Sequence, residues 1–267
     1  MKKNKFIKYA GTSLGLLCAT MSLSYGEINL NDCIAGNKFS CNSKDLQGED
    51  AEKVLNFLIN QKANIEGIEI NRCNLENDFC TKFVKVLTDN TTLKELDLGG
   101  NRIGREGAKA LAGALEMNTT LKELGLYDNW IQDDGAKALA WALKTNTTLE
   151  KLWLHDNQIG KKGAIALALA LTMNTTLKDL TLFKNFISDD GAIALAWALT
   201  MNTTLKSLHL NFAWIGYQGA TALVRVLEDN TTLEYLNLTD NPMKAEGRNA
   251  LREAWVKTRG TAANLYL

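Results

Sequence analysis

A period of 28 residues organises most of this 267-residue chain. The repeated string has the form Leu-x-x-Leu-x-Leu-x-x-Asn and first appears complete from Leu93 to Asn101. Its copies begin at positions 93, 121, 149, 177, 205 and 233, and a variant copy begins at Ile65 in the same phase. A unit of this length cannot bury its own apolar face, so the units must stack on one another. Residues 65–260 are therefore predicted to form one solenoid of seven repeats.

Each repeat divides into a strand half and a helix half. Both leucines of the Leu-x-Leu alternation turn to one face of a strand, because side chains alternate along a strand. The helix half follows a glycine such as Gly107 and lines apolar residues along one face, as from Ala108 to Leu115. It ends at an Asn such as Asn118, a residue that tolerates the left-handed conformation of a helix stop. Helices are wider than the strand spacing of about 4.8 Å, so the stack must curve with its strands inside.

The predicted fold class is thus α/β, a leucine-rich-repeat solenoid with parallel inner strands and outer helices. The repeated string resembles the ribonuclease-inhibitor-like class of leucine-rich repeats, and six consecutive copies carry that resemblance. The class includes protein inhibitors, innate-immune sensor modules and a GTPase-activating subgroup. The resemblance implies a curved horseshoe that binds proteins on its concave face, without implying which proteins.

The segments that flank the repeats have their own patterns. Residues 1–26 combine four lysines, a short semi-apolar run and small residues before the end, which is typical of a secretory signal peptide. An uncleaved anchor or a disordered start is the alternative. Residues 27–64 are predicted to form an N-terminal cap, and residues 261–267 a capping strand displaced by one residue from the register. The predicted location is secreted or periplasmic, with the cell surface as a further option.

Charge excludes some classes of partner. The chain holds 30 basic and 30 acidic residues, and removal of residues 1–26 leaves 26 basic residues against 30 acidic ones. This mild acidity argues against a nucleic-acid partner and against an anionic membrane surface. After cleavage we expect no integral membrane span and a monomeric chain.

Four cysteines of the mature chain lie in its first third, at Cys33, Cys41, Cys73 and Cys80. In an exported protein this even number predicts a disulfide-stapled cap. Pairing of Cys33 with Cys41 and of Cys73 with Cys80 is the sequence-local choice among three. Alternatively, Cys73 is a buried free thiol, because it takes a repeat position where Asn otherwise recurs.

Few residues suggest chemistry. The two histidines, His155 and His209, belong to strands two repeats apart, which places those strands about 10 Å apart and makes a shared metal site improbable. Paired acids at Asp133-Asp134 and Asp189-Asp190 precede helix glycines, where carboxylates cap free amides. The sequence contains no phosphate-binding glycine loop and no recognisable catalytic motif. We therefore expect no enzymatic activity, no cofactor and no bound metal.

Ring-bearing residues occupy the variable positions that alternate with the buried leucines, and these positions face the concave side. We predict that they form a partner-binding patch, because exposed aromatic rings are enriched in binding hot spots. The predicted patch consists of Tyr127, Trp153, His155, Phe183, His209, Phe212 and Tyr235. The alternative is a ladder of rings that stack on each other and contribute stability only.

Other aromatic residues are assigned different roles. Trp130, Phe186 and Trp214 follow the Asn position directly and are predicted to pack locally. Trp141 and Trp197 project from the convex helices, where they cover neighbouring helices or mark a second surface. Ala213 replaces the Asn of the string, so loosening is expected at residues 211–216.

The function predicted from these features is an exported, non-enzymatic scaffold that recognises a protein through its concave face. If the chain comes from a host-associated bacterium, the scaffold is expected to be a host-directed effector or an adhesin. The alternatives are a regulator of a GTPase, an inhibitor of another enzyme, and a structural envelope protein without a dedicated ligand.

Overall fold

The computed structural model describes residues 29–60 and 65–267. The predicted signal peptide at 1–26 lies outside the described residues, as do residues 61–64. None of the helices in the described part of the chain is both long and apolar enough to cross a membrane.

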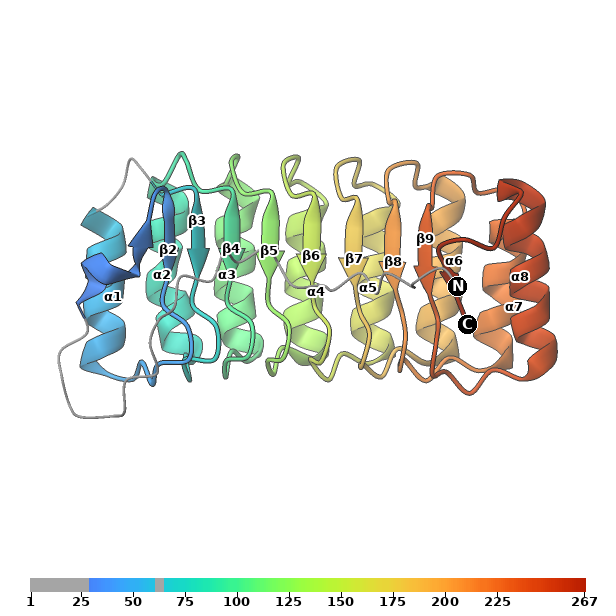
Figure 1. Ribbon diagram of the computed structural model, residues 1–267, viewed down its shortest axis with the longest axis horizontal. Helices are drawn as coiled ribbons and strands as arrows, with labels where there is room; N and C mark the ends of the chain where they lie inside the picture. The colour runs from blue at the N-terminus through green and yellow to red at the C-terminus, as the bar shows by residue number, and fades with distance from the viewer. Residues whose placement is uncertain (1–28, 61–64) are drawn as a thin grey trace, which may run out of the picture.

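Within the described residues, ten strands form one sheet in sequence order, and helices cover one side of it (Figure 1). The strands are β1 (Ile34–Ala35), β2 (Lys38–Ser40), β3 (Gly67–Glu69), β4 (Glu95–Asp97), β5 (Glu123–Gly125), β6 (Lys151–Trp153), β7 (Asp179–Thr181), β8 (Ser207–His209), β9 (Tyr235–Asn237) and β10 (Leu265–Tyr266). The helices are the 3₁₀ turn η1 (Leu30–Cys33) and α1 (Glu49–Asn60), α2 (Asn77–Asp89), α3 (Arg105–Met117), α4 (Gln132–Leu143), α5 (Lys161–Leu171), α6 (Ser188–Met201), α7 (Tyr217–Leu227) and α8 (Ala245–Arg259).

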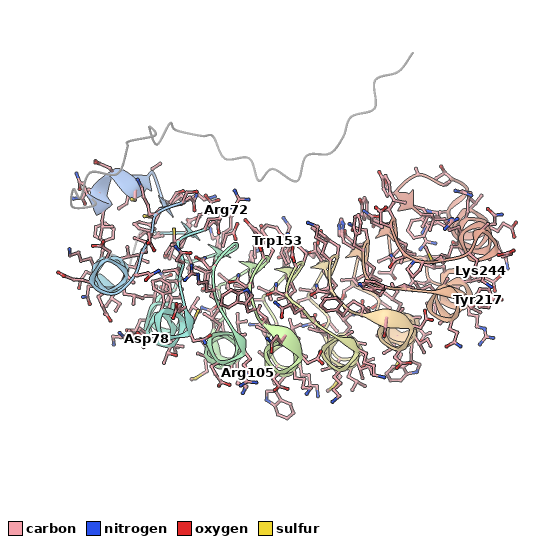
Figure 2. All side chains as sticks on the ribbon, turned by 90° about the horizontal axis from the view of Figure 1, so that it is seen from below. Arg72, Asp78, Arg105, Trp153, Tyr217 and Lys244 are labelled. Atoms are coloured by element: carbon pink, nitrogen blue, oxygen red, sulfur yellow. The ribbon has the colours of Figure 1, made fainter. Side chains whose placement is uncertain are left out.

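The sheet is parallel from β2 to β10, and β1 joins β2 as an antiparallel hairpin. Leu96, Leu124 and Leu152 are direct neighbours, so the pairing register equals the sequence period. The last pair differs, because Leu265 lies opposite Leu236 and is thus displaced by one residue. Viewed along the helices the molecule is an arc with strands inside and helices outside (Figure 2). The α/β solenoid predicted from the repeats is confirmed.

One continuous core lies between the strands and the helices. From β4 to β9 the strands and the residues just past them contribute leucines with almost no exposed surface, such as Leu152 and Leu154. The facing helix contributes alanines and leucines at helical spacing, with Ala164 and Leu167 as examples in α5. Small alanine side chains let neighbouring helices approach closely, and the leucines fill the space next to the sheet.

A ladder of buried Asn side chains joins successive repeats just past the strands. The Asn157 Nδ2 donates to the carbonyls of Leu126, 2.8 Å away in the previous repeat, and of Leu154, 3.1 Å away in its own. Its Oδ1 accepts the Ile131 amide of the previous repeat at 3.3 Å. Asn101, Asn129, Asn185 and Asn241 repeat this pattern. These amides satisfy backbone groups that burial would otherwise leave unpaired.

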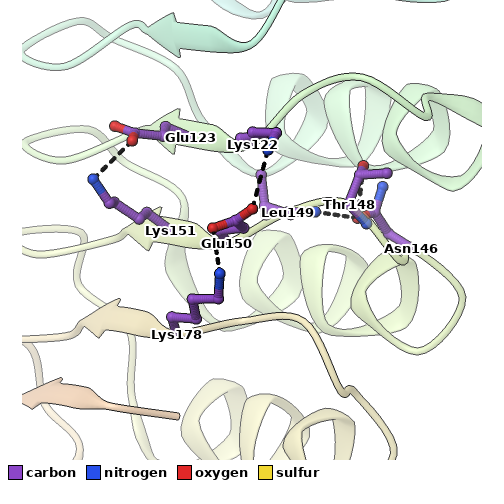
Figure 3. A network of polar contacts seen from close by, with 8 residues as sticks. All are labelled: Lys122, Glu123, Asn146, Thr148, Leu149, Glu150, Lys151 and Lys178. Carbon is purple, nitrogen blue, oxygen red and sulfur yellow. Dashed lines mark hydrogen bonds and ion pairs between the residues drawn. The ribbon is translucent and has the colours of Figure 1, made fainter. Parts of the chain in front are cut away.

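A second Asn ladder runs along the helix ends, where the sequence suggested left-handed stops. The helix-end Asn118 is extended, with φ −77° and ψ 130°. In the next repeat, Asn146 accepts the amides of Thr148 at 3.0 Å and Leu149 at 2.8 Å, and donates to the Leu115 carbonyl at 2.9 Å (Figure 3). The Asn-Thr-Thr-Leu string is thus a turn that leads the chain from a helix into the next strand.

Ala213 does not loosen its repeat, contrary to the sequence-based expectation. Phe212 has φ 53°, the same as Lys184 at the equivalent position of the preceding repeat. The Ala213 amide donates to the Asn241 Oδ1 at 3.0 Å, as the ladder pattern requires. The neighbouring repeats hold the backbone in place although the side-chain bonds of this repeat are missing.

All four cysteines of the described chain are free thiols, so neither predicted disulfide is present in the structure. The Cys33 and Cys41 side chains are hydrogen-bonded to each other, and this bond lowers the pKa of Cys33 to about 7. Cys73 is a buried free thiol, as the alternative interpretation of the sequence predicted. Its thiol donates a hydrogen bond to the Cys41 carbonyl at 3.0 Å. Burial raises the pKa of Cys80 to about 12. A Cys33–Cys41 disulfide stays a prediction for an oxidising compartment.

Candidate protein-binding surface

The predicted patch residues lie on the strands or just past them, and Trp153 projects on the inner side of the arc, away from the helices (Figure 2). Five of them are partly buried, namely Tyr127, Trp153, His155, Phe183 and Tyr235. His209 is almost completely buried, with 3% of its surface exposed, whereas Phe212 is 49% exposed. The structure therefore places these side chains on one face, with very different access to a partner.

Most of the rings form two stacks that run across the strands. Tyr127 and His155 are parallel within 2° with centroids 4.7 Å apart, and Phe183 follows His155 at 4.0 Å. The second stack joins His209 to Tyr235 at 4.6 Å, and Tyr235 continues to Tyr266 of β10 at 5.2 Å. The ladder of stacked rings, which the sequence analysis gave as the alternative to a binding patch, is thus present. Because the rings of the first stack remain partly exposed, the ladder also offers an apolar surface.

Glycines on the neighbouring strands allow the rings to lie flat. A Cβ atom at Gly99 would lie 2.2 Å from the Tyr127 ring, and one at Gly125 would lie 3.2 Å from the Trp153 ring. The Tyr127 hydroxyl donates to the Asp97 carboxylate at 3.2 Å, which fixes the ring over the preceding repeat. This surface is therefore rigid before any partner binds.

Trp153 combines exposure with an unsatisfied donor. Its indole Nε1 is buried and has no hydrogen-bond partner among the described residues. Indole N–H groups usually find an acceptor when they are buried, because an unmade hydrogen bond costs about 1–3 kcal/mol. The Trp153 donor is thus a feature of the patch that the sequence could not reveal.

Acidic residues line the concave face beside the rings, an arrangement that the sequence analysis did not single out. Glu95 and Glu123 occupy equivalent positions of β4 and β5, and Glu123 is paired with Lys151 at 2.7 Å (Figure 3). Glu69 and Glu95 share Lys38, at 2.6 and 3.6 Å. The signal was present in the sequence as acids recurring at the 28-residue interval.

Three rings predicted to pack locally are exposed instead, so that prediction was wrong. Trp130, Phe186 and Trp214 each leave half or more of their surface exposed. Each directly precedes an isoleucine, such as Ile131, whose side chain is completely buried. Because neighbouring side chains in this loop point in opposite directions, the ring must turn outward when the isoleucine turns inward. This adjacency is the signal that sequence reasoning missed.

A family model described as "Leucine Rich repeat" matches the chain at 89–112, 118–140, 145–168, 174–196, 202–224 and 229–251. These six segments together cover just over half of the sequence. The chain belongs to the leucine-rich repeat family. Leucine-rich repeats form scaffolds that bind other proteins, and such scaffolds are generally non-enzymatic.

Three solved structures are similar to this leucine-rich repeat chain at low identity. Leiomodin-1 actin-binding site 2 is 23% identical with a TM-score of 0.41, over 48% of this chain and 74% of that one. The tropomodulin C-terminal domain of Caenorhabditis elegans is 12% identical with a TM-score of 0.42, over 79% and 94%. A pollen receptor kinase 3 is 21% identical with a TM-score of 0.43, over 68% and 76%. No curated protein matches the chain.

The histidines of the leucine-rich repeat patch are neutral near pH 7. Burial lowers the pKa of His155 to about 4 and that of His209 to about 4. His155 also faces the positive charge of Lys184, and its Nδ1 is 3.0 Å from the Thr181 hydroxyl. Burial raises the pKa of Asp179 to about 6. The ring stack is therefore uncharged when it meets a partner at neutral pH.

Acidification is expected to destabilise the leucine-rich repeat fold through His155. The ordinary histidine pKa is about 6.5, so the unfolded chain takes up this proton before the folded one does. The stability contributed by neutral His155 is present above about pH 6.5 and is lost as the pH falls toward 4. Between pH 7 and pH 5 we expect a loss of about 2 kcal/mol from this group.

Urea unfolding of wild type and His155→Gln at both pH values measures this loss. The contribution of His155 is the part of the decrease in unfolding free energy between pH 7 and pH 5 that wild type shows and His155→Gln does not. Asp179 contributes with the opposite sign, because its folded pKa is raised, and the comparison cancels it. Equal pH dependence of the two proteins would refute the role of His155.

The paired acids of the leucine-rich repeats act as caps between repeats. The Asp133 Oδ1 accepts the amides of Gly160 and Gly163, both at 2.8 Å, at the start of the following helix α5. Asp189 holds the start of α7 in the same way, through Gly216 and Gly219. The predicted capping role is confirmed, with the difference that each acid caps the next helix rather than its own.

Removal of this cap has a measurable cost. We expect Asp133→Ala to lower the free energy of unfolding by about 1.5 kcal/mol, because two amides at a helix N-terminus lose their acceptor. Asp133→Asn keeps the acceptor oxygen and is expected to lose less than half of that. Asp134→Ala is the matched control, since Asp134 is exposed and forms only a surface ion pair with Lys137. Chemical denaturation of the three variants distinguishes a cap from a general charge effect.

Proposed function

We propose that this leucine-rich repeat protein binds a protein partner through the concave patch centred on Trp153. The observation that carries the proposal is the partly exposed ring of Trp153, which lies on the inner face next to the stacked rings of Tyr127, His155 and Phe183. A partner that covers these rings would remove their exposed apolar surface from water, which favours binding. Because the stacked neighbours are already ordered, such binding loses little conformational entropy.

The charge beside the rings narrows the class of partner segment. Glu95 and Glu123 flank the ring stack toward the N-terminal end of the arc. Glu95 reaches only a long ion pair with Lys38, at 3.6 Å, and about half of its side chain is exposed. A segment that presents an apolar or aromatic side chain next to a lysine or arginine fits both features.

The cellular setting belongs to the same proposal. The basic and semi-apolar residues 1–26 support export, and residues 27–64 and 261–267 support caps at the two ends of the repeats 65–260. The repeat string supports the ribonuclease-inhibitor-like subtype. A host-directed effector or an adhesin is the role that combines export with protein binding.

Replacement of patch residues tests the proposal. We expect Trp153→Ala to weaken partner binding at least tenfold, because central aromatic residues dominate interface energies. Phe183→Ala should act in the same direction. The matched control is Met117→Ala, an exposed apolar side chain at the end of the outer helix α3, which should bind as wild type does.

The measurement is capture from host-cell or periplasmic extracts, followed by titration of the captured protein. Circular dichroism and thermal unfolding of each variant verify that the fold is intact. Unchanged affinity of folded Trp153→Ala and Phe183→Ala would discard the concave patch. Loss of binding in Met117→Ala alone would show that the partner does not bind through the concave patch.

A further inference from the structure

The outward faces of α5 and α6 are mainly apolar beyond their first turns, which carry the exposed charges of Lys161, Lys162 and Asp190. On α5 the exposed positions hold Ile165 and Leu169, and Met173 follows just past its end. On α6 the equivalent positions hold Ile193, Trp197 and Met201. These six side chains are 36% to 64% exposed. Exposed positions of a solenoid helix normally carry polar residues, so this face needs an explanation.

The neighbouring helices show that the apolar face is confined to the middle of the convex side. In α3 the equivalent outward positions hold Lys109, Gly113 and Met117, so only the last is apolar, and in α7 they hold Thr221, Arg225 and Asp229. Trp141 on α4, which is 62% exposed, extends the face by one ring. Figure 2 shows the helices as the outer layer of the arc, so a partner approaching from outside meets the middle helices first.

The size of this face matches one side of a protein interface. The six side chains together with Trp141 expose on the order of 700 Å², more than the largest apolar patch of a typical monomer. A stable interface buries about 800 Å² on each partner. The face thus supplies most of one side of such an interface, and the residues at its α4 and α7 borders would supply the rest.

The charges at its two borders are complementary to each other. On the α4 border, Lys144 lies 4.9 Å from the centroid of the Trp141 ring. The α7 border lies three repeats further along the chain. There Glu228 takes the repeat position of Lys144, and Arg225 takes that of Trp141. Glu228 contacts Lys257 at only 3.4 Å, and both side chains are exposed.

We propose that two copies of the chain dimerise through this convex face. A two-fold axis that runs parallel to the helices, between α5 and α6, places α5 opposite α6 of the second copy and α4 opposite α7. Ile165 then faces Ile193 of the second copy, Leu169 faces its Trp197, and Met173 faces its Met201. The same operation places Lys144 opposite Glu228 and Trp141 opposite Arg225 at both borders.

The competing two-fold axis, perpendicular to the helices, is disfavoured by charge. It would place α4 against α4 of the second copy, so that Lys137 and Lys144 meet like charges. The parallel axis alone pairs opposite charges at the borders. In this dimer the two concave faces point away from each other, so both stay open to partners. The monomer expected from the sequence is replaced by this dimer.

Sedimentation velocity of the purified chain at about 1 to 100 μM tests the proposal. We expect a species of twice the 29.4 kDa chain mass that dissociates on dilution. Trp197→Glu, at an exposed site in the centre of the face, should weaken association at least a hundredfold. Met117→Glu is the matched control, because Met117 is exposed at the end of α3 outside the face.

A charge exchange tests the orientation of the two copies. Lys144→Glu and Glu228→Lys should each weaken the dimer roughly fivefold, and the double variant should restore it. A wild-type chain that stays monomeric at the highest concentration overturns the proposal, as does a dimer that Trp197→Glu leaves unchanged. Failure of the double variant to recover overturns the proposed axis. Monomeric chain that sediments with phosphatidylcholine vesicles would assign the face to a membrane surface instead.

Discussion

Asn157→Ala is expected to lower the free energy of unfolding by about 4 kcal/mol. Asn157 is completely buried, and its side chain satisfies the carbonyls of Leu126 and Leu154 together with the Ile131 amide. Alanine would leave these backbone groups without partners in a dry interior, and each such group costs about 1–3 kcal/mol. Because the lost bonds join two repeats, the array should also lose cooperativity at this interface.

Guanidinium unfolding followed by circular dichroism measures the change. Asn249→Ala is the matched control, since Asn249 is an exposed residue of α8 and the same substitution there should be neutral. Ala213→Asn is the reverse experiment: it restores the missing ladder side chain and should raise stability by about 1 kcal/mol. A loss below about 1 kcal/mol for Asn157→Ala would show that the ladder is not a main source of stability.

Gly191→Ala is expected to destabilise the protein by about 3 kcal/mol, although alanine favours helices. A Cβ atom at this position of α6 would lie 2.6 Å from the Ile187 Cγ2 and 2.8 Å from the Ala164 Cβ of the neighbouring helix. Both contacts are far closer than carbon atoms allow, so two helices would have to separate. The glycine is thus required by the packing distance between repeats rather than by its backbone angles.

Gly247→Ala provides a control of opposite sign. At this equivalent position in α8 a Cβ atom would meet only the Ala220 Cβ, at 3.4 Å. The substitution should therefore stabilise the protein by about 0.5–1 kcal/mol through helix propensity. Thermal unfolding of the two variants gives the comparison. Shifts of the same sign would contradict the packing explanation.

The number, order and type of the repeating elements could be read from the sequence. Leucines such as Leu124 and Leu152 recur at one interval, and a parallel ladder forms only when equivalent residues pair. The alternation of Leu and variable residues also placed Trp153 on the inner face.

The sequence was less informative wherever a side chain leaves the regular elements. The outward turn of Trp130 was missed, because loop side chains follow local backbone angles rather than a strand or helix period. The acid at Asp133 was recognised as a cap, but its contact with the following helix depends on the distance between repeats. The apolar residues of α5 and α6 can be read from the sequence. The opposite charges at the α4 and α7 borders become meaningful only when the structure shows that the four helices lie side by side.

The 28-residue interval by itself determined the solenoid, its parallel sheet and the direction in which the leucines point, because these depend only on periodicity and on burial of apolar surface. The tertiary structure alone decided which rings stack, which donor stays unpaired and which helix faces are left open. Those properties depend on distances between atoms of different repeats, and a pattern along one chain does not contain these distances.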